Sequence, residues 1–163
     1  MKKIDKFIGV IAGSFDPFSL GHLDIVQRSA CLVDTLFIAI GKNSSKQAKF
    51  SIETRKSMVE QCTLQMDNVG VHVFDCALTD YLQSVHANVL IRGIRSCVDF
   101  EYEKTVSAVL KQQLPNLECI YLLAKPSLQH ISSSVINELI ANNANLKGYL
   151  PYEIIQYTGP IRV

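Results

Sequence analysis

Residues 7–24 of this 163-residue chain read FIGVIAGSFDPFSLGHLD. The apolar run 7–12 predicts a buried strand, and a glycine-bearing turn then leads to Gly21 and His22 at the start of a helical pattern. A helix start offers unpaired backbone N–H groups and the positive end of the helix dipole. His22 adds a side chain that can donate to a phosphate oxygen. The stretch therefore predicts a phosphate site, although it is neither a Walker loop nor a Gly-x-Gly-x-x-Gly fingerprint.

Four further apolar runs have a similar Val, Ile and Leu content, and with the first they predict five strands at 7–12, 36–40, 69–74, 89–92 and 119–123. Near-continuous runs of this kind are typical of strands covered on both faces, as in a parallel sheet. Helical patterns lie between the strands and after them, at 23–33, 52–66, 100–113 and 133–143, with a short last helix opened by Pro151. The alternation predicts an α/β, Rossmann-like, doubly wound five-stranded parallel sheet in a single domain spanning 1–163.

The composition bounds the class of protein. A hydrophobic content of 48%, a charged content of 19% and a formal net charge of +1 are typical of a globular protein and give no strong field toward nucleic acid or membranes. The five cysteines are odd in number, scattered and without a Cys-x-x-Cys pair, which argues against a disulfide framework or a thiolate zinc site. We expect reduced, mostly buried thiols, a cytoplasmic location, and no nucleic-acid or membrane partner.

Polar side chains follow the predicted strands, at the sheet edge where open α/β sheets bind ligands. Ser14 and Asp16 follow the first strand; with His22 they favour a phosphate site, although Asp16 and Pro17 would also suit a simple tight turn. Three lysines, at 42, 46 and 49, follow the second strand. Their loop suits either solvent or an anion, and the pattern alone does not choose among them.

Two arginines follow the fourth strand. Arg92 and Arg95 stand three apart around a glycine, which suits planar recognition of phosphate. The alternative is ion pairing with nearby carboxylates, at Asp99, Glu101 or Glu103.

Three serines, at 132–134, precede a predicted helix after the fifth strand, where they suit either helix caps or a phosphate chain. We expect His130 to be a surface or packing histidine. The pattern shows no Ser/His/Asp order, paired-carboxylate site or His-rich metal spacing.

Taken together, these stretches resemble the bacterial phosphopantetheine adenylyltransferases, nucleotidylyltransferases with a T/SxGH motif that is spelled here from Ser14 to His22. The resemblance covers nearly the whole chain. The segments that carry it are GSFDP at 13–17, GHLDIV at 21–26, SK at 45–46, FSIETR at 50–55, VLIRGIR at 89–95, DFEYE at 99–103 and ISSS at 131–134. The block from Arg92 to Glu103 is the most specific of them.

The resemblance implies transfer of AMP from ATP to 4′-phosphopantetheine, giving dephospho-coenzyme A and pyrophosphate in the penultimate step of coenzyme A synthesis. The acceptor phosphate would itself attack the α-phosphorus in line, without a covalent enzyme intermediate. Catalysis would then rest on positioning and on stabilising charge in the transition state.

The resemblance also implies roles for individual residues. Those that would act in catalysis are Ser14, His22, Lys46 and Arg95. Those that would bind phosphopantetheine are Ser14, Lys46, Leu78 and Arg92. Those that would bind ATP are Ser14, Phe15, His22, Arg95, Glu103, Ser133 and Ser134. Mg²⁺ is expected to bridge phosphates mainly through ATP oxygens and water, with no metal site built from protein side chains. A homohexamer, as a dimer of trimers, and feedback binding of coenzyme A are further expectations.

The chain departs from the family pattern at several positions. Ser14 replaces the usual threonine, the proline often found before Lys46 is missing, and Leu128 and His130 replace aromatics near the adenine. Two rival interpretations stand beside this one: a nucleotidylyltransferase for nicotinamide mononucleotide or a cytidine nucleotide, and a non-catalytic nucleotide-binding module on the same fold.

Overall fold

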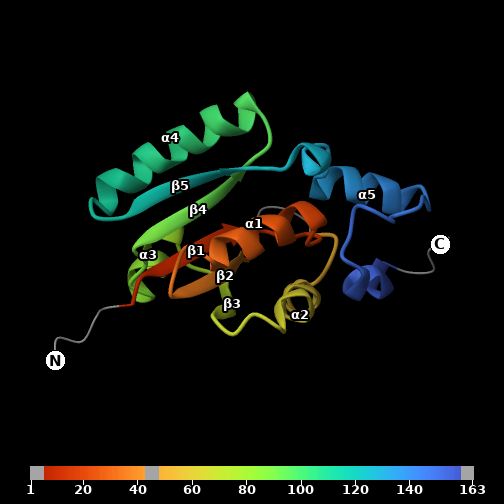
Figure 1. Cartoon of the computed structure of the whole chain (residues 1–163), viewed down its shortest axis with the longest axis horizontal. Coiled ribbons are helices and arrows are strands. Elements are labelled where there is room, and N and C mark those ends of the chain that lie inside the picture. The colour runs from red at the N-terminus through yellow and green to blue at the C-terminus, as the bar shows by residue number, and fades with distance from the viewer. Residues whose placement is uncertain (1–5, 43–47, 159–163) are drawn as a thin grey trace.

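The structure is a computed structural model that describes residues 6–42 and 48–158 (Figure 1). Its strands are β1 Ile8–Gly13, β2 Thr35–Gly41, β3 Val69–Phe74, β4 Val89–Ile94 and β5 Glu118–Leu123. Its helices are α1 Leu20–Ala30, α2 Ile52–Thr63, α3 Leu78–Ser84, α4 Cys97–Gln113 and α5 Ser133–Ala141, with the short 3₁₀ helices η1 Pro126–Leu128 and η2 Tyr152–Thr158.

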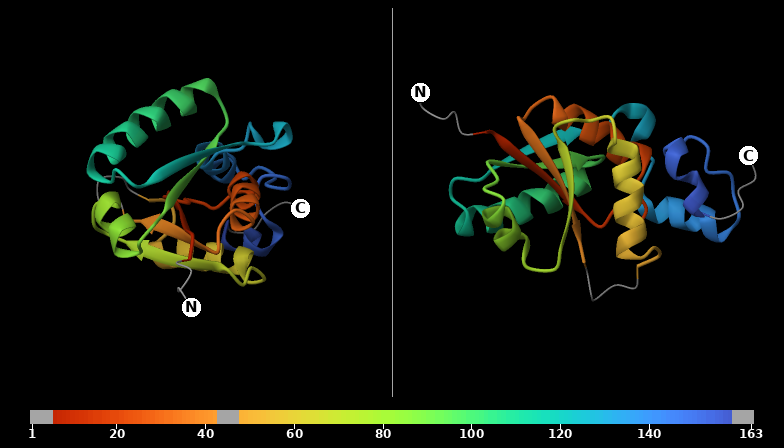
Figure 2. Two further views of the ribbon diagram at one scale, coloured as in Figure 1. Left: turned by 60° about the vertical axis from the view of Figure 1, so that its left-hand side comes forward. Right: turned by 90° about the horizontal axis from the view of Figure 1, so that it is seen from below.

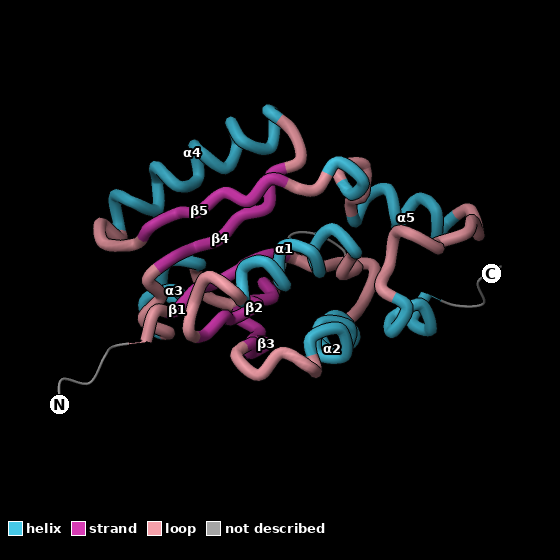
Figure 3. The backbone as a smooth tube through the Cα atoms, viewed as in Figure 1, coloured by secondary structure: helices cyan, strands magenta, loops and turns pink. Residues whose placement is uncertain are grey.

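The five strands form one sheet in the order β3-β2-β1-β4-β5 (Figure 3). Every pair of neighbouring strands is parallel. The predicted five-stranded parallel sheet is confirmed. The chain winds outward from β1 in both directions, so the strand order reverses between β1 and β4. This is the position at which ligands bind in open α/β sheets.

Helices cover both faces of the sheet, and each face has its own core (Figure 2). Ile11 of β1 packs on one face with α1, α2 and the segments that follow α5, whereas its neighbour Val10 packs on the other face with α3 and α4. Because successive strand residues point to opposite faces, strands buried on both sides read as continuous apolar runs. This is why the sequence revealed the strands so clearly.

Two helices differ from the sequence expectation. The sequence pattern did not indicate α3, since it has seven residues and its N-cap, Ala77, makes no side-chain capping bond. α4 begins at Cys97, three residues before the predicted start. Ser96 accepts a hydrogen bond from the Asp99 N–H at 3.2 Å and so caps the extra turn.

The expectation that the cysteines are mostly buried is wrong. Cys31, Cys76 and Cys97 are exposed, and Cys62 and Cys119 are half-buried. The exposed thiols lie at helix ends or in a loop, where a side chain does not face the sheet. Among the described residues, no helix is both long enough and apolar enough to cross a membrane.

The contact between β1 and β4 is much shorter than the other strand contacts. β1 pairs with β2 over six residue pairs but with β4 over only two, Gly9 with Val89 and Val10 with Leu90. Beyond Val10 the two strands diverge toward their carboxyl ends. The divergence opens space in the middle of the sheet edge.

Gly9 keeps β1 close to the elements around it, and its replacement tests this packing. A Cβ added there would lie 2.9 Å from Val33 Cγ1. We expect Gly9→Ala to lower the free energy of unfolding by about 1–3 kcal/mol through overpacking, as measured by urea denaturation. Gly41→Ala is the matched control, because its Cβ would meet Phe74 at an ordinary 3.4 Å. An equal loss of stability in both variants would contradict this account.

Candidate active site

A cavity of about 570 Å³ lies where β1 and β4 diverge. Its walls come from the ends of both strands, the start of α1, the first half of α4 and the segment from β5 to α5. The predicted site residues that line it are Phe15, His22, Arg92, Arg95, Glu103, Ser133 and Ser134.

The other three predicted site residues are not among the lining residues. Ser14 is exposed on the turn between two lining residues, Gly13 and Phe15. Leu78 begins α3 after the edge strand β3, and it packs against the core that lies between the sheet and helices α3 and α4. Lys46 lies outside the described residues.

The start of α1 holds the His22 ring in one orientation. Ser19 is the N-cap, and its Oγ accepts the His22 backbone N–H at 3.2 Å. In return, the Ser19 backbone N–H donates to His22 Nδ1 at 3.1 Å. The ring also stacks on Phe18 and meets the edge of Phe15, with centroids 5.7 and 5.1 Å apart. Sequence reasoning missed Ser19, although a serine three residues before a polar helical residue is the usual capping-box signal.

These contacts fix the protonation of His22. Since a backbone N–H can only donate, Nδ1 must accept, and the proton of the neutral imidazole is therefore on Nε2. Burial, followed by the nearby charge of Arg95, lowers the pKa of His22 to about 4. The ring is thus a neutral donor at pH 7, and its Nε2–H is the group available to a ligand.

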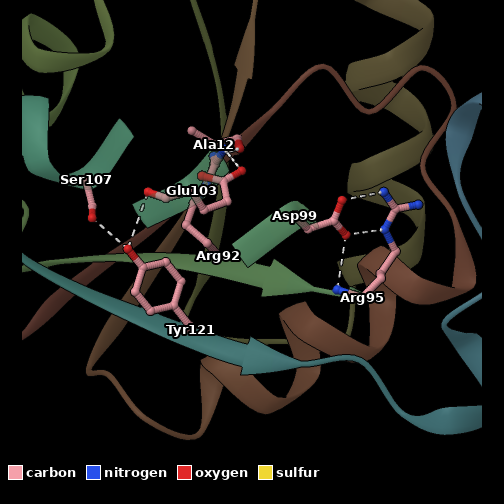
Figure 4. Close-up of polar contacts among 7 residues, drawn as sticks. All are labelled: Ala12, Arg92, Arg95, Asp99, Glu103, Ser107 and Tyr121. Carbon is pink, nitrogen blue, oxygen red and sulfur yellow. Dashed lines mark hydrogen bonds and ion pairs between the residues drawn. The ribbon is translucent and has the colours of Figure 1, made fainter. Parts of the chain in front are cut away.

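Arg92 spans the gap between the diverging strands (Figure 4). Its Nε and Nη2 donate to the two carboxylate oxygens of Glu103 at 2.7 and 2.6 Å. Its Nη1 donates to the Ala12 carbonyl of β1 at 2.8 Å. The guanidinium thereby donates to a β1 carbonyl that lies two residues beyond Val10, where the pairing of β1 with β4 ends. A planar fork held on two sides presents its remaining N–H groups in a fixed direction.

Arg95 forms a second ion pair with a carboxylate of α4, and this pair is more exposed than that of Arg92 with Glu103. Its Nε and Nη2 donate to the Asp99 carboxylate at 3.0 and 3.2 Å (Figure 4). The ion-pair alternative raised by the sequence is therefore present for both arginines. Both nonetheless line the cavity.

Of the two roles that the sequence left open for the serines at the start of α5, the structure shows helix capping. Ser132 is the N-cap, since its Oγ accepts the Val135 N–H at 3.2 Å. Ser133 Oγ donates to the Pro17 carbonyl at 3.0 Å, which ties α5 to the turn after β1. Both serines and Ser134 line the cavity at the start of α5.

A buried carboxylate fixes the segment after β5. Asp24 of α1 is 5% exposed and pairs with Lys125 at 2.5 Å and with Arg28 at 3.0 Å. Burial opposes ionisation of Asp24, but hydrogen bonds from Lys125 and Arg28 bring its pKa below the ordinary value. Arg28 also donates to the Leu123 carbonyl at 2.8 Å. Asp24 and Arg28 are an i,i+4 pair on α1, but no sequence pattern predicts their contacts with Lys125 and Leu123, which lie about a hundred residues further along the chain.

The arrangement suits stabilisation of negative charge on phosphate oxygens. A neutral imidazole N–H, two oriented guanidinium groups and hydroxyls face one cavity. Such donors act most strongly when they are fixed before the reaction. Among the described residues, no group of three or more His, Cys, Asp or Glu side chains is placed to hold a metal ion.

Comparison with known proteins agrees with this chemistry. The cytidylyltransferase-like family model matches residues 10–139. The phosphopantetheine adenylyltransferase of Staphylococcus saprophyticus is 40% identical over 145 residues, covering 89% of this chain and 90% of its own. The enzyme of that name from Clostridium perfringens is 36% identical over 149 residues, covering 91% of each chain.

Two solved structures share the fold at low identity. A putative nicotinate-nucleotide adenylyltransferase from Vibrio parahaemolyticus has a TM-score of 0.67 at 12% identity, over 94% of this chain and 98% of that one. A lipopolysaccharide core biosynthesis protein from Thermoplasma volcanium has a TM-score of 0.58 at 15% identity, over 74% of this chain and 98% of that one.

Fold and site together define a nucleotidyltransferase of the cytidylyltransferase-like class. Within that class, the sequence identity of 36–40% over about 90% of the chain to phosphopantetheine adenylyltransferases identifies the family. The chain belongs to the phosphopantetheine adenylyltransferase family.

The protonation of His22 can be measured directly. We expect its imidazole to titrate near pH 4 in ¹H–¹⁵N NMR, with the neutral ring protonated at Nε2. Since the unfolded chain takes up this proton near pH 6.5, stability contributed by the neutral ring should fall as pH falls from about 6.5 to about 4. A midpoint near 6.5, or a proton on Nδ1 of the neutral ring, would contradict the geometry.

Proposed function

We propose that this chain carries out the reaction for which its relatives are named: adenylyl transfer from ATP to 4′-phosphopantetheine, giving dephospho-coenzyme A and pyrophosphate. One observation carries the proposal. The fixed Nε2–H of His22 and the guanidinium groups of Arg92 and Arg95 line a single cavity where β1 and β4 diverge. Family membership supplies the substrates.

In the proposed reaction, a phosphate oxygen of phosphopantetheine forms a bond to the α-phosphorus of ATP. The bond from that phosphorus to the oxygen of the leaving pyrophosphate breaks, and the pyrophosphate carries away the electron pair. His22 donates through Nε2–H to an α-phosphate oxygen while charge builds on it. No side chain takes the transferred group, so the residues act by position and charge.

The two arginines take different phosphates in this proposal. Arg92, held between Ala12 and Glu103, binds the acceptor phosphate, and Arg95 binds the nucleotide. Each arginine uses its N–H groups that are not engaged by carboxylates. Ser14 and Lys46 orient the acceptor phosphate beside the nucleotide, and Leu78 contacts the pantetheine arm through its backbone.

The remaining predicted residues belong to the nucleotide side. Phe15 lies in the turn below the phosphates, and Ser133 and Ser134 lie at the start of α5, where hydroxyls and helix N–H groups suit the leaving phosphates. Glu103 completes the nucleotide site while it holds Arg92.

We further propose that Mg²⁺ enters with ATP. Among the residues that the structure describes, the charged side chains that line the cavity are two arginines and two carboxylates, whose formal charges cancel. ATP therefore brings negative charge that these side chains do not balance. Mg²⁺, when bound, would bridge phosphate oxygens and neutralise part of that charge.

Assembly, regulation and location complete the proposal. Val109 of α4 and Leu123 at the end of β5 expose apolar side chains outside the cavity lining, which favours contact with further copies in a homohexamer. Coenzyme A differs from the proposed product by one phosphate, so it would compete for the same cavity as a feedback inhibitor. A cytoplasmic location is part of the same proposal.

Pyrophosphate release tests the reaction. Purified protein with ATP and Mg²⁺ should release pyrophosphate only when 4′-phosphopantetheine is present, in equal amount to dephospho-coenzyme A. Nicotinamide mononucleotide in place of phosphopantetheine, and CTP in place of ATP, test the rival nucleotidylyltransferases. ATP binding without release for any acceptor would instead favour the non-catalytic nucleotide-binding module.

The role of His22 has a matched test. His22→Ala should lower kcat by about 100-fold or more, because one oriented donor to the reacting phosphate is lost. ATP affinity should change far less. His86→Asn is the control, since this exposed residue follows α3, lies outside the cavity lining and has a positive φ that asparagine tolerates. Near-normal turnover by His22→Ala would remove His22 from the mechanism.

A further inference from the structure

Arg55 of α2 is a buried arginine that forms no ion pair among the described residues, although its charge is one of several causes that lower the pKa of the exposed Glu53 two residues earlier. Its side chain is 5% exposed. None of the ion pairs in the described part of the chain includes it. Its Nη1 donates to the Ser14 carbonyl at 2.7 Å, and its Nε is buried without a partner. An unpaired buried charge opposes folding, so its presence calls for a compensating function.

The bond from Arg55 sets the direction of a peptide group in the turn after β1. The peptide between Ser14 and Phe15 is trans, so its carbonyl and its N–H point in opposite directions. With the carbonyl turned toward Arg55, the Phe15 N–H is turned away from α2. Phe15 lines the cavity, and its N–H has no acceptor among the described residues.

Two more donors hold the same turn, and both come from α5. Asn137 Nδ2 donates to the Asp16 carbonyl at 2.9 Å, and Ser133 Oγ donates to the Pro17 carbonyl at 3.0 Å. The carbonyls of three turn residues are therefore satisfied from α2 and α5. Phe15 has a φ of +47°, a left-handed conformation that a bulky residue adopts only when its surroundings impose it. The ring of Phe15 fits because Gly13, whose Cβ would lie 3.1 Å from Phe15 Cζ, has no side chain.

We propose that Arg55 is a positioning residue of the nucleotide site. It directs the Phe15 N–H toward a phosphate oxygen in the cavity and places a fixed positive charge behind the turn. The bound phosphate supplies the negative charge that the ligand-free fold does not give to Arg55. This inference rests on the proposed function for the identity of the ligand, and it adds a residue that does not touch that ligand.

Arg55→Met separates this role from a purely structural one. The Ser14 carbonyl belongs to an exposed residue and can be hydrated, and the substitution removes an unpaired buried charge. We therefore expect the unfolding midpoint of the ligand-free protein to stay the same or rise. The dissociation constant for ATP with Mg²⁺, measured by calorimetry, should increase about 10- to 100-fold, as for loss of a charged hydrogen bond. Arg55→Lys, which keeps the charge, should restore part of that affinity.

The neighbouring residue provides the control. Lys56→Met removes a cation from the same helix, but the Lys56 side chain is 44% exposed and, among the described residues, forms its ion pair with Glu60 at 3.4 Å. This variant should bind ATP like the unsubstituted protein. Calorimetry separates the inference from the proposed function, because ATP binding can be normal even where phosphopantetheine is not turned over.

A lower unfolding midpoint for Arg55→Met together with unchanged ATP affinity would overturn the proposal in favour of a structural role. Absence of ATP binding by the unsubstituted protein would also overturn it. If Arg55→Met does not fold, Arg55→Gln replaces it in the same measurements of unfolding midpoint and ATP affinity, since the glutamine amide can donate a hydrogen bond without a charge. If neither neutral variant folds, the charge of Arg55 is needed for folding itself, and this result would also overturn the proposal.

Discussion

The short pairing between β1 and β4 is the constraint on which the site depends. The two strands share only two residue pairs before they diverge, and the cavity begins beyond the second. Divergence leaves main-chain groups of both strands without a ladder partner. Arg92 resolves this at one point, because its guanidinium donates to the Ala12 carbonyl across the gap. A residue proposed to bind the acceptor phosphate thus also supports the opened sheet, so the proposed site and the fold are coupled through one side chain.

Charge is arranged in the cavity so that donors are fixed while the net charge stays low. Glu103 and Asp99 lie four residues apart on α4 and hold Arg92 and Arg95 from the same helix. Paired guanidinium groups lose little further freedom when a phosphate arrives, which reduces the entropic cost of binding. His22 follows the same principle without a charge: burial keeps the ring neutral, and Ser19 fixes the tautomer. The residues are ordered before a ligand binds, as electrostatic catalysis requires.

Local sequence patterns predicted the sheet and its switch point, and together with the family resemblance they named seven of the residues that line the cavity. Apolar runs marked the strands, and polar residues directly after β1, β4 and β5 had to meet at one edge. The sequence did not predict the contacts that hold those residues in place. Asp24 with Lys125, and Arg55 with Ser14, join segments far apart in the chain, and no spacing rule connects them. It also placed the cysteines mostly in the core, although residue type alone does not say which side of an element a residue occupies.

Arg55, Arg92 and Arg95 lie near the turn after β1 and the end of β4, and they differ in whether a carboxylate pairs with them. Arg92 and Arg95 are paired with carboxylates, so each adds direction to the cavity with little net charge. Arg55 is unpaired and lies behind the turn, where it adds charge and orients a peptide without reaching the cavity lining. If all three were paired, they would add little net positive charge near the cavity; if none were, repulsion among them would oppose folding. In the role proposed for Arg55, the two arginines that line the cavity are paired and the third, behind the turn, adds a fixed positive charge to the site.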